Sequence, residues 1–86
     1  MAFYNIKWKR SAAKELKKLS PHAIQRVLQA VEKLSIDPRP PESRKLFGSK
    51  RTYRIRVGVY RVIYTFEVDR LVVEVIKVGH RKDVYR

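Results

Sequence analysis

Three runs typical of β-strands follow one another between residues 52 and 78, with almost no sequence between them. They are TYRIRV (52–57), VYRVIYTF (59–66) and LVVEVIKV (71–78), and all are rich in β-branched and aromatic residues. Gly58 alone separates the first two runs. Because connections this short favour antiparallel pairing, this part of the chain is predicted to form an antiparallel sheet.

An N-terminal strand and a first helix are predicted before this sheet. Residues 3–8 (FYNIKW) carry aromatic and β-branched side chains, which favour a strand. Ser11 is expected to cap a helix formed by SAAKELKKL, residues 11–19. The next helix follows with almost no connector, so the two helices should form an antiparallel or steeply crossed hairpin.

The second helix has the clearest start signal and the clearest apolar stripe in the chain. Ser20 suits its N-cap and Pro21 its first position, where a missing N–H costs nothing. Asp37 and Pro38 should end it, because the residue before a proline avoids the helical region. Its apolar side chains recur at helical spacing and should face the core: Ile24, Val27, Leu28, Val31 and Leu34.

These segments together predict a single domain, residues 1–86, of the α+β class in the order β-α-α-β-β-β. A small antiparallel sheet would carry the helix hairpin on one face. The first strand would join at an edge or beside the last strand, and the sequence leaves both open. Residues 37–50, with three prolines and a glycine, indicate a loop anchored by Leu46 and Phe47. A chain this short has little room for a deep active site, so its function should lie on a surface or shallow groove.

The net charge and the composition limit the classes of partner that this protein could bind. Lys and Arg total 21 against 8 Asp and Glu, a formal net charge of +13, which attracts polyanions such as nucleic acids. The absence of cysteine excludes a disulfide framework and a thiol nucleophile, and it suits the cytoplasm. No membrane span, signal peptide, metal or cofactor is expected. Seven basic residues and no acidic residue lie between Glu42 and Glu67: Arg44, Lys45, Lys50, Arg51, Arg54, Arg56 and Arg61.

Alternation along the strands predicts where these charges point. Ile55 and Val57 would face the helices, and Arg54 and Arg56 would face the open side. Arg61 is the only charge in a run that resembles a central strand, where a charge requires water, a partner or a ligand. It could form a salt bridge with an acidic residue. Alternatively, it shares the open face with the other two arginines and binds phosphate through its planar donor fork.

The last ten residues, KVGHRKDVYR (77–86), contain several charged or titratable side chains and a tyrosine. Gly79 would let the last strand turn and bring His80, Arg81 and Tyr85 back over the open face. Metal-independent RNA cleavage, in which a ribose 2′-OH attacks its neighbouring phosphate, requires a base, a counter-charge for the phosphorane and an acid. Tyrosine can also stack on a base. These residues therefore predict an RNA-cleavage site shared by the sheet and the tail.

Two stretches, YRIRVGVYRVIY and VGHRKDVY, resemble the RelE/ParE superfamily of bacterial and archaeal toxin–antitoxin systems, and the resemblance covers nearly the whole chain. RelE-like members cut mRNA in the A site of the ribosome, whereas ParE-like members share the fold and poison DNA gyrase. Resemblance to the RelE branch implies an endoribonuclease toxin that acts on mRNA on the 70S ribosome, in contact with 16S rRNA. It also implies a cognate antitoxin, which would cover the basic face or wrap the helix hairpin.

The same resemblance assigns roles to residues. Arg61 and Arg81 would hold the scissile phosphate, and Tyr85 would stack on or orient the attacked nucleotide. RelE-like chains often carry lysines at the positions of Arg54 and Arg56; because arginine cannot plausibly act as a base, His80 becomes the best alternative. Pure electrostatic catalysis by the arginines is the other possibility. The expected catalytic residues are Arg56, Arg61, His80, Arg81 and Tyr85, and the expected RNA- and phosphate-binding residues are Arg44, Lys45, Lys50, Arg51, Arg54 and Lys82.

Two other functions remain compatible with the sequence. One is a ParE-like inhibitor of DNA gyrase, although gyrase binding gives no evident reason for the full set of arginines and the terminal tyrosine. The other is a domain that binds RNA or the ribosome and blocks translation without cleavage. The replacement of lysine by arginine at positions 54 and 56 keeps this second alternative open.

Overall fold

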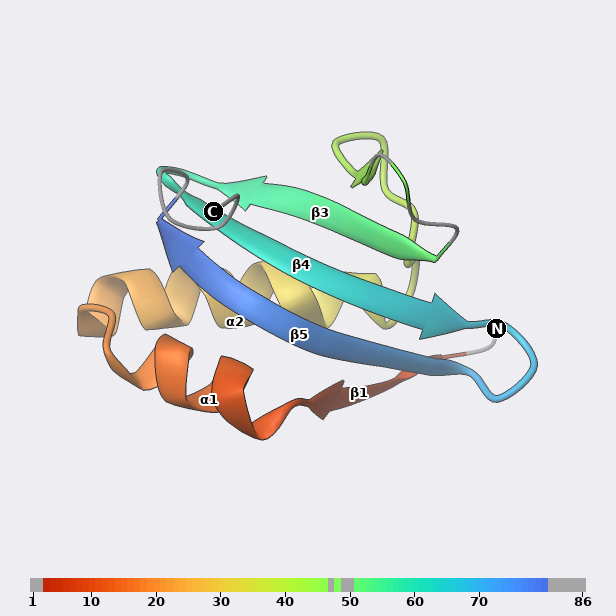
Figure 1. Ribbon diagram of the computed structural model, residues 1–86, viewed down its shortest axis with the longest axis horizontal. Helices are drawn as coiled ribbons and strands as arrows, with labels where there is room; N and C mark the ends of the chain where they lie inside the picture. The colour runs from red at the N-terminus through yellow and green to blue at the C-terminus, as the bar shows by residue number, and fades with distance from the viewer. Residues whose placement is uncertain (1–2, 47, 49–50, 81–86) are drawn as a thin grey trace.

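The computed structural model describes residues 3–46, 48 and 51–80, and it contains a five-stranded sheet with two helices packed on one face (Figure 1). This arrangement confirms the predicted α+β class and the helix hairpin. The elements in chain order are β1 (Asn5–Trp8), α1 (Arg10–Lys17), α2 (Pro21–Leu34), β2 (Arg44–Lys45), β3 (Thr52–Val57), β4 (Tyr60–Glu67) and β5 (Val72–His80).

The strand order in the sheet is β1-β5-β4-β3-β2, and β3, β4 and β5 form the predicted antiparallel succession. Gly58 lies in the β3–β4 turn with a φ of 61°, a left-handed conformation that favours glycine. The first strand pairs with β5 in parallel, which decides the question that the sequence left open. The short β2 was not predicted, because two residues within a proline-rich loop carry no periodic signal; it pairs antiparallel with β3.

The predicted start of α2 is confirmed. The Ser20 hydroxyl accepts a hydrogen bond from the backbone N–H of Ala23 at 3.2 Å, and Pro21 is the first helical residue. The predicted cap of α1 is wrong: Lys9 is its N-cap residue, without a side-chain hydrogen bond, and Ser11 lies inside the helix. The reason is tertiary, because the Lys9 N–H donates to the Val75 carbonyl at 2.9 Å and the helix begins as soon as this contact with β5 ends.

Removing the Ser20 hydroxyl should therefore destabilise the protein modestly. Ser20→Ala leaves one N–H of the first turn of α2 without its acceptor, and we expect the free energy of unfolding to fall by about 1 kcal/mol. Urea denaturation measures this difference. Ser11→Ala is the matched control and should not lower stability, since Ser11 caps no helix. Equal losses in the two variants would contradict this assignment.

A single hydrophobic core lies between the helices and the sheet. The helix α2 contributes Val27, Val31 and Leu34, but Leu28, predicted to be buried, keeps 44% of its surface exposed. Two helices cover the sheet from one side only, so α2 buries a narrow stripe and Leu28 is turned away from the sheet. The buried core cluster is Ala12, Val27, Val31, Leu34, Ile55, Val57, Val62, Tyr64, Val73, Val75 and Val78.

The loop between α2 and β3 is attached to this core through Tyr64, which is fully buried. Its hydroxyl donates to the Pro38 carbonyl at 2.6 Å. Leu46, predicted to anchor the loop, is half-buried, and its N–H donates to the Thr52 carbonyl at 2.8 Å; Phe47 lies outside the described residues. Neither helix in the described part of the chain is long and apolar enough to cross a membrane.

Burial raises the pKa of Tyr64 from 10.0 to about 12, which predicts a loss of stability in alkali. In the unfolded chain this tyrosine ionises near its ordinary value, whereas the folded protein holds the proton. The protonated Tyr64 hydroxyl therefore contributes its full share to the free energy of unfolding below pH 10, and this share is lost as the pH rises from 10 to 12. We expect the free energy of unfolding to fall by about 2 kcal/mol between pH 10 and pH 12. Urea denaturation at several pH values, with Tyr64→Phe as the control, checks it: equal slopes in both proteins would contradict the prediction.

Candidate nucleic-acid interface

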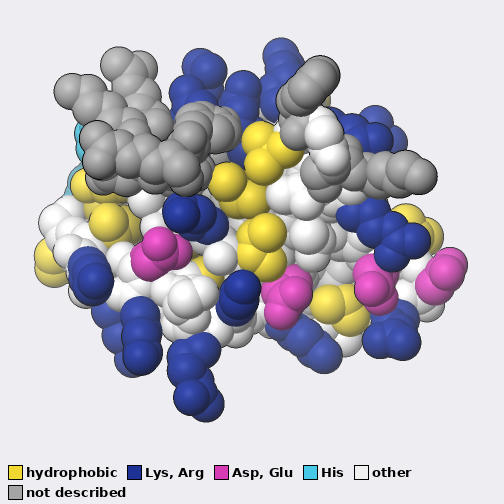
Figure 2. All heavy atoms as spheres, in the orientation of Figure 1, with side chains coloured by type: hydrophobic (Ala, Val, Ile, Leu, Met, Phe, Trp, Pro, Cys, Tyr) yellow, Lys and Arg dark blue, Asp and Glu magenta, His cyan; other side chains and the backbone are white. Residues whose placement is uncertain are grey.

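The face of the sheet that points away from α1 and α2, here called the open face, carries four of the predicted site residues: Arg44, Arg54, Arg56 and Arg61. Along β3, Ile55 and Val57 are buried toward the helices, so Arg54 and Arg56 point to the open face, as predicted. Figure 2 looks onto this face: Lys and Arg side chains lie along its upper rim and also along its lower edge, and acidic side chains lie toward the right, near the β4–β5 turn, and left of centre.

The edge of the open face contains a shallow hollow of about 270 Å³. Glu42, Arg44, Arg54 and Arg56 line it. Arg44 lies opposite Arg54 in the β2–β3 pair, so the unpredicted strand β2 brings a third arginine beside the two of β3. One Arg44 nitrogen, Nη1, donates to the carbonyls of Pro41 and Ser43 at 3.0 and 2.9 Å, which holds this side chain against the loop. Three cations and one carboxylate give the hollow a positive balance that suits an anion.

Arg61 lies at the centre of the open face. It is directly opposite Arg56 on β3 and opposite Gly79 on β5, and its Nε is shielded from solvent. Like charges directly opposite one another destabilise a strand pair. An anion can bridge two guanidinium groups placed in this way, and phosphate matches the planar fork of arginine donors. The pair is therefore a candidate phosphate-binding feature of the open face.

A β-bulge in β5 changes which residues reach the open face. Ile63 lies opposite Lys77 while Tyr64 lies opposite Val75, so Ile76 is the additional residue. Simple alternation from Val75 would have turned Lys77 toward the helices. The bulge instead places Lys77 on the open face, in one row with Ile63 and Arg54. Sequence reasoning missed this lysine because Ile76 looks like any other β-branched strand residue.

The predicted turn at Gly79 is wrong, because β5 continues through His80. Antiparallel pairing holds Gly79 and His80 in the ladder, opposite Arg61 and Tyr60. The register puts His80 on the helix side of the sheet, where its ring meets that of Tyr60 edge-on with centroids 6.1 Å apart. His80 and Arg61 therefore point to opposite faces, and a role for His80 in proton transfer stays a prediction.

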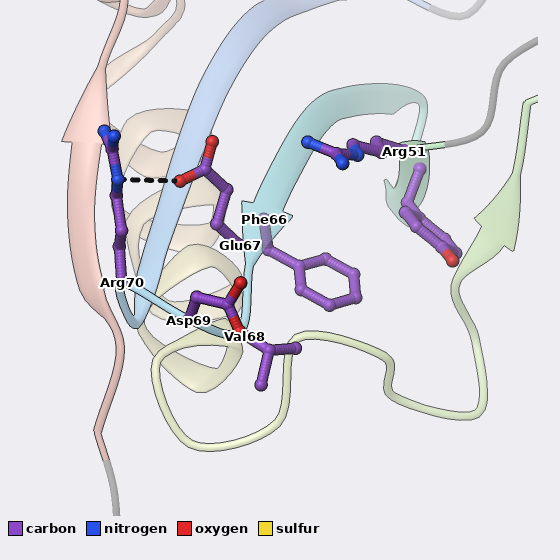
Figure 3. Close-up of a pocket in the computed structure, with 7 residues that line it drawn as sticks. Arg51, Phe66, Glu67, Val68, Asp69 and Arg70 are labelled. Atoms are coloured by element: carbon purple, nitrogen blue, oxygen red, sulfur yellow. Dashed lines mark ion pairs between the residues drawn. The ribbon is translucent and has the colours of Figure 1, made fainter.

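Two further basic residues lie apart from the open face. Lys45 is opposite Tyr53, whose side chain packs against the core, so Lys45 belongs to the helix side. Arg51 lines a different hollow of about 380 Å³ at the β4–β5 turn (Figure 3), near the ion pair of Arg70 with Glu67 at 3.6 Å. Four residues of the expected site lie outside the described residues: Lys50, Arg81, Lys82 and Tyr85.

Comparison with known proteins places this architecture in a family. The model of the family described as the ParE toxin of type II toxin–antitoxin system, parDE, matches residues 6–85. The toxin RelG of Mycobacterium tuberculosis is 32% identical over 96% of this chain and 97% of its own. The chain belongs to the RelE/ParE superfamily of type II toxins. Its family model carries the ParE name, whereas this relative carries a Rel name.

Solved structures confirm the fold of this RelE/ParE toxin. A chain of the archaeal RelE–RelB complex from Pyrococcus horikoshii superimposes with a TM-score of 0.82 at 30% identity, covering 95% of this chain and 99% of that one. A chain of the intact RelBE toxin–antitoxin complex of Escherichia coli gives 0.80 at 28% identity, covering 90% and 95%. The shared fold therefore extends over nearly the whole chain.

The described residues of this toxin contain no cluster of three or more His, Cys, Asp or Glu side chains that could hold a metal ion. Its open face instead offers guanidinium and ammonium groups, which bind phosphate by charge and by hydrogen bonds. Groups of this kind can bind an RNA backbone and stabilise negative charge that develops on a phosphate.

Proposed function

We propose that this toxin is a ribosome-dependent endoribonuclease that cuts mRNA in the ribosomal A site without a metal ion. The reaction is attack by a ribose 2′-OH on the adjacent phosphate. The observation that carries the proposal is the direct opposition of Arg56 and Arg61 on the open face. Two guanidinium groups placed in this way can bind one phosphate together through charge-assisted hydrogen bonds.

Under this proposal, each arginine of the open face has a role that suits its position. Arg56 and Arg61 bind the scissile phosphate and stabilise the charge of the phosphorane, which concentrates on the oxygens between them. Arg44 and Arg54, in the adjoining hollow, hold a neighbouring phosphate of the same strand. Resemblance to the RelE branch adds Arg81 at the scissile phosphate and Tyr85 against the attacked nucleotide. The ribosome supplies the geometry of the mRNA, in contact with 16S rRNA.

A cognate antitoxin is part of this proposal, since several structural relatives are complexes of RelE with RelB. One arrangement places an acidic or amphipathic antitoxin segment over the open face, where it neutralises the arginines. The other wraps the helix hairpin, where Leu28 is an exposed apolar side chain. A cross-linking map of the complex with the protein encoded beside the toxin distinguishes them. Cross-links confined to residues 12–34 would reject the first arrangement.

Primer extension on mRNA from cells after brief induction of the toxin tests the cleavage reaction. We expect discrete breaks inside translated frames with the parent and none with Arg81→Ala. The name of the matching family model favours a second candidate, a ParE-like gyrase inhibitor. Growth arrest without mRNA breaks would reject the nuclease. Inhibition of DNA supercoiling by gyrase would then support that second candidate, and its absence would favour a translation blocker that binds without cleavage.

A further inference from the structure

The proposed reaction requires a group that removes the proton from the attacking 2′-OH. Arginine cannot do this, because its guanidinium stays protonated in proteins. His80 lies on the helix side of β5, opposite Tyr60, and not beside Arg61. Among the described residues of β3, β4 and β5, Lys77 is the lysine that the register places on the open face with these arginines, and an amine can release and take up a proton. Lys7 of β1 lies on the same face, but it is opposite Glu74, five residues along β5 from the Gly79 that faces Arg61.

We infer that Lys77 is the general base of the cleavage reaction, an inference that rests on the proposed function. The bulge at Ile76 places Lys77 on the open face while Val75 and Val78 stay in the core. Bulges of this kind often lie beside active sites, where they redirect a side chain. Without the bulge, an ammonium group would be directed into the hydrophobic core.

The position of Lys77 suits a group that acts beside Arg61. Arg61 lies opposite Gly79, so Lys77, two residues earlier on β5, is its diagonal neighbour. Diagonal neighbours on adjacent strands are about 7–8 Å apart, within reach of long side chains. Gly79 contributes no side chain between them. Ile63, directly opposite Lys77 and only 6% exposed, forms an apolar wall on one side of the lysine stem.

The proton and bond changes balance without a further reagent. The neutral amine of Lys77 takes the proton of the 2′-OH, and the 2′ oxygen forms a bond to the adjacent phosphorus. The bond from phosphorus to the 5′ oxygen of the next nucleotide breaks, and that oxygen takes a proton from solvent. The products are a 2′,3′-cyclic phosphate and a free 5′-OH. Because the amine must be neutral before it can act, the rate should rise with pH.

Single-turnover cleavage of mRNA on purified programmed ribosomes, measured against pH, tests this inference. The decisive variant is Lys77→Arg, which keeps the positive charge but cannot act as a base. We expect its rate to fall about 10²–10⁴-fold at saturating toxin, with loss of the rise with pH. Lys77→Gln is a second variant, without the bulk of arginine, and its cleavage rate should fall by the same factor. Circular dichroism and urea midpoints identify any variant that fails to fold.

His80→Gln tests the competing assignment, in which His80 is the base, since it removes the imidazole at the end of the same strand. If Lys77 is the base, this variant should keep the pH dependence of the parent. Cleavage by Lys77→Arg at the parent rate, or loss of the pH dependence in His80→Gln but not in Lys77→Arg, would overturn the inference while the proposed nuclease function stands. A parent protein that cleaves no mRNA would overturn the inference and the proposed function together.

Discussion

Arg61→Ala should abolish toxicity and slow mRNA cleavage on the ribosome by about 10²–10³-fold, the usual cost of removing one group that stabilises a developing oxyanion. Arg61 is central to the open face and lies directly opposite Arg56, so its loss removes one of the two guanidinium groups that the sheet offers to the proposed scissile phosphate. The fold should stay intact, because Arg61 is not part of the buried core. Arg61→Lys should recover only part of the rate, since lysine keeps the charge but not the planar donor fork.

The control for this prediction is Arg70→Ala, which removes the same charge near the β4–β5 turn. Arg70 is strongly exposed there, with 80% of its side-chain surface accessible, and it pairs with Glu67. Cell growth after induction and single-turnover cleavage should remain close to those of the parent. Equal loss of activity in Arg61→Ala and Arg70→Ala would mean that the total charge matters and the position does not, which contradicts the proposed site.

Leu34→Ala should lower the free energy of unfolding by about 2–5 kcal/mol, through lost burial and the cavity that remains. Leu34 is fully buried at the end of α2, within the core cluster. A small domain has a total stability of only about 5–15 kcal/mol, so this variant should unfold at a markedly lower urea concentration.

Leu28→Ala on the same helix is the matched comparison. The sequence predicts a core position for Leu28, but the structure leaves 44% of its surface exposed, so its loss should cost well under half as much as that of Leu34. Urea denaturation of both variants measures the two losses in the free energy of unfolding, so they can be compared directly. A larger loss for Leu28→Ala than for Leu34→Ala would show that α2 buries a different face.

Local sequence signals were sufficient to predict much of the fold. Ser20 and Pro21 mark the start of α2 by the chemistry of their own backbone and side chains, independent of the rest of the protein. The strand runs and Gly58 likewise determine the antiparallel order of β3, β4 and β5. Alternation along β3 was enough to place Arg54 and Arg56 on the open face, because no bulge interrupts that strand pair.

The features that escaped prediction depend on contacts between distant segments. The start of α1 is determined by the contact of Lys9 with Val75, and Ser11 gives no sign of it. The strand β2 forms only because β3 offers a partner edge to its two residues. The bulge at Ile76 depends on the pairing of β4 with β5, so neither the place of Lys77 on the open face nor that of His80 on the helix side could be derived by counting along β5.

The central claim is that the open face of this toxin cuts mRNA held in the ribosome. The most direct measurement combines purified toxin with end-labelled mRNA, once on programmed 70S ribosomes and once free in solution. We predict a single cut at the A-site codon that depends on the ribosome and is lost in Arg61→Ala. Intact mRNA on the ribosome at saturating toxin, with the parent protein still arresting growth, would contradict the account.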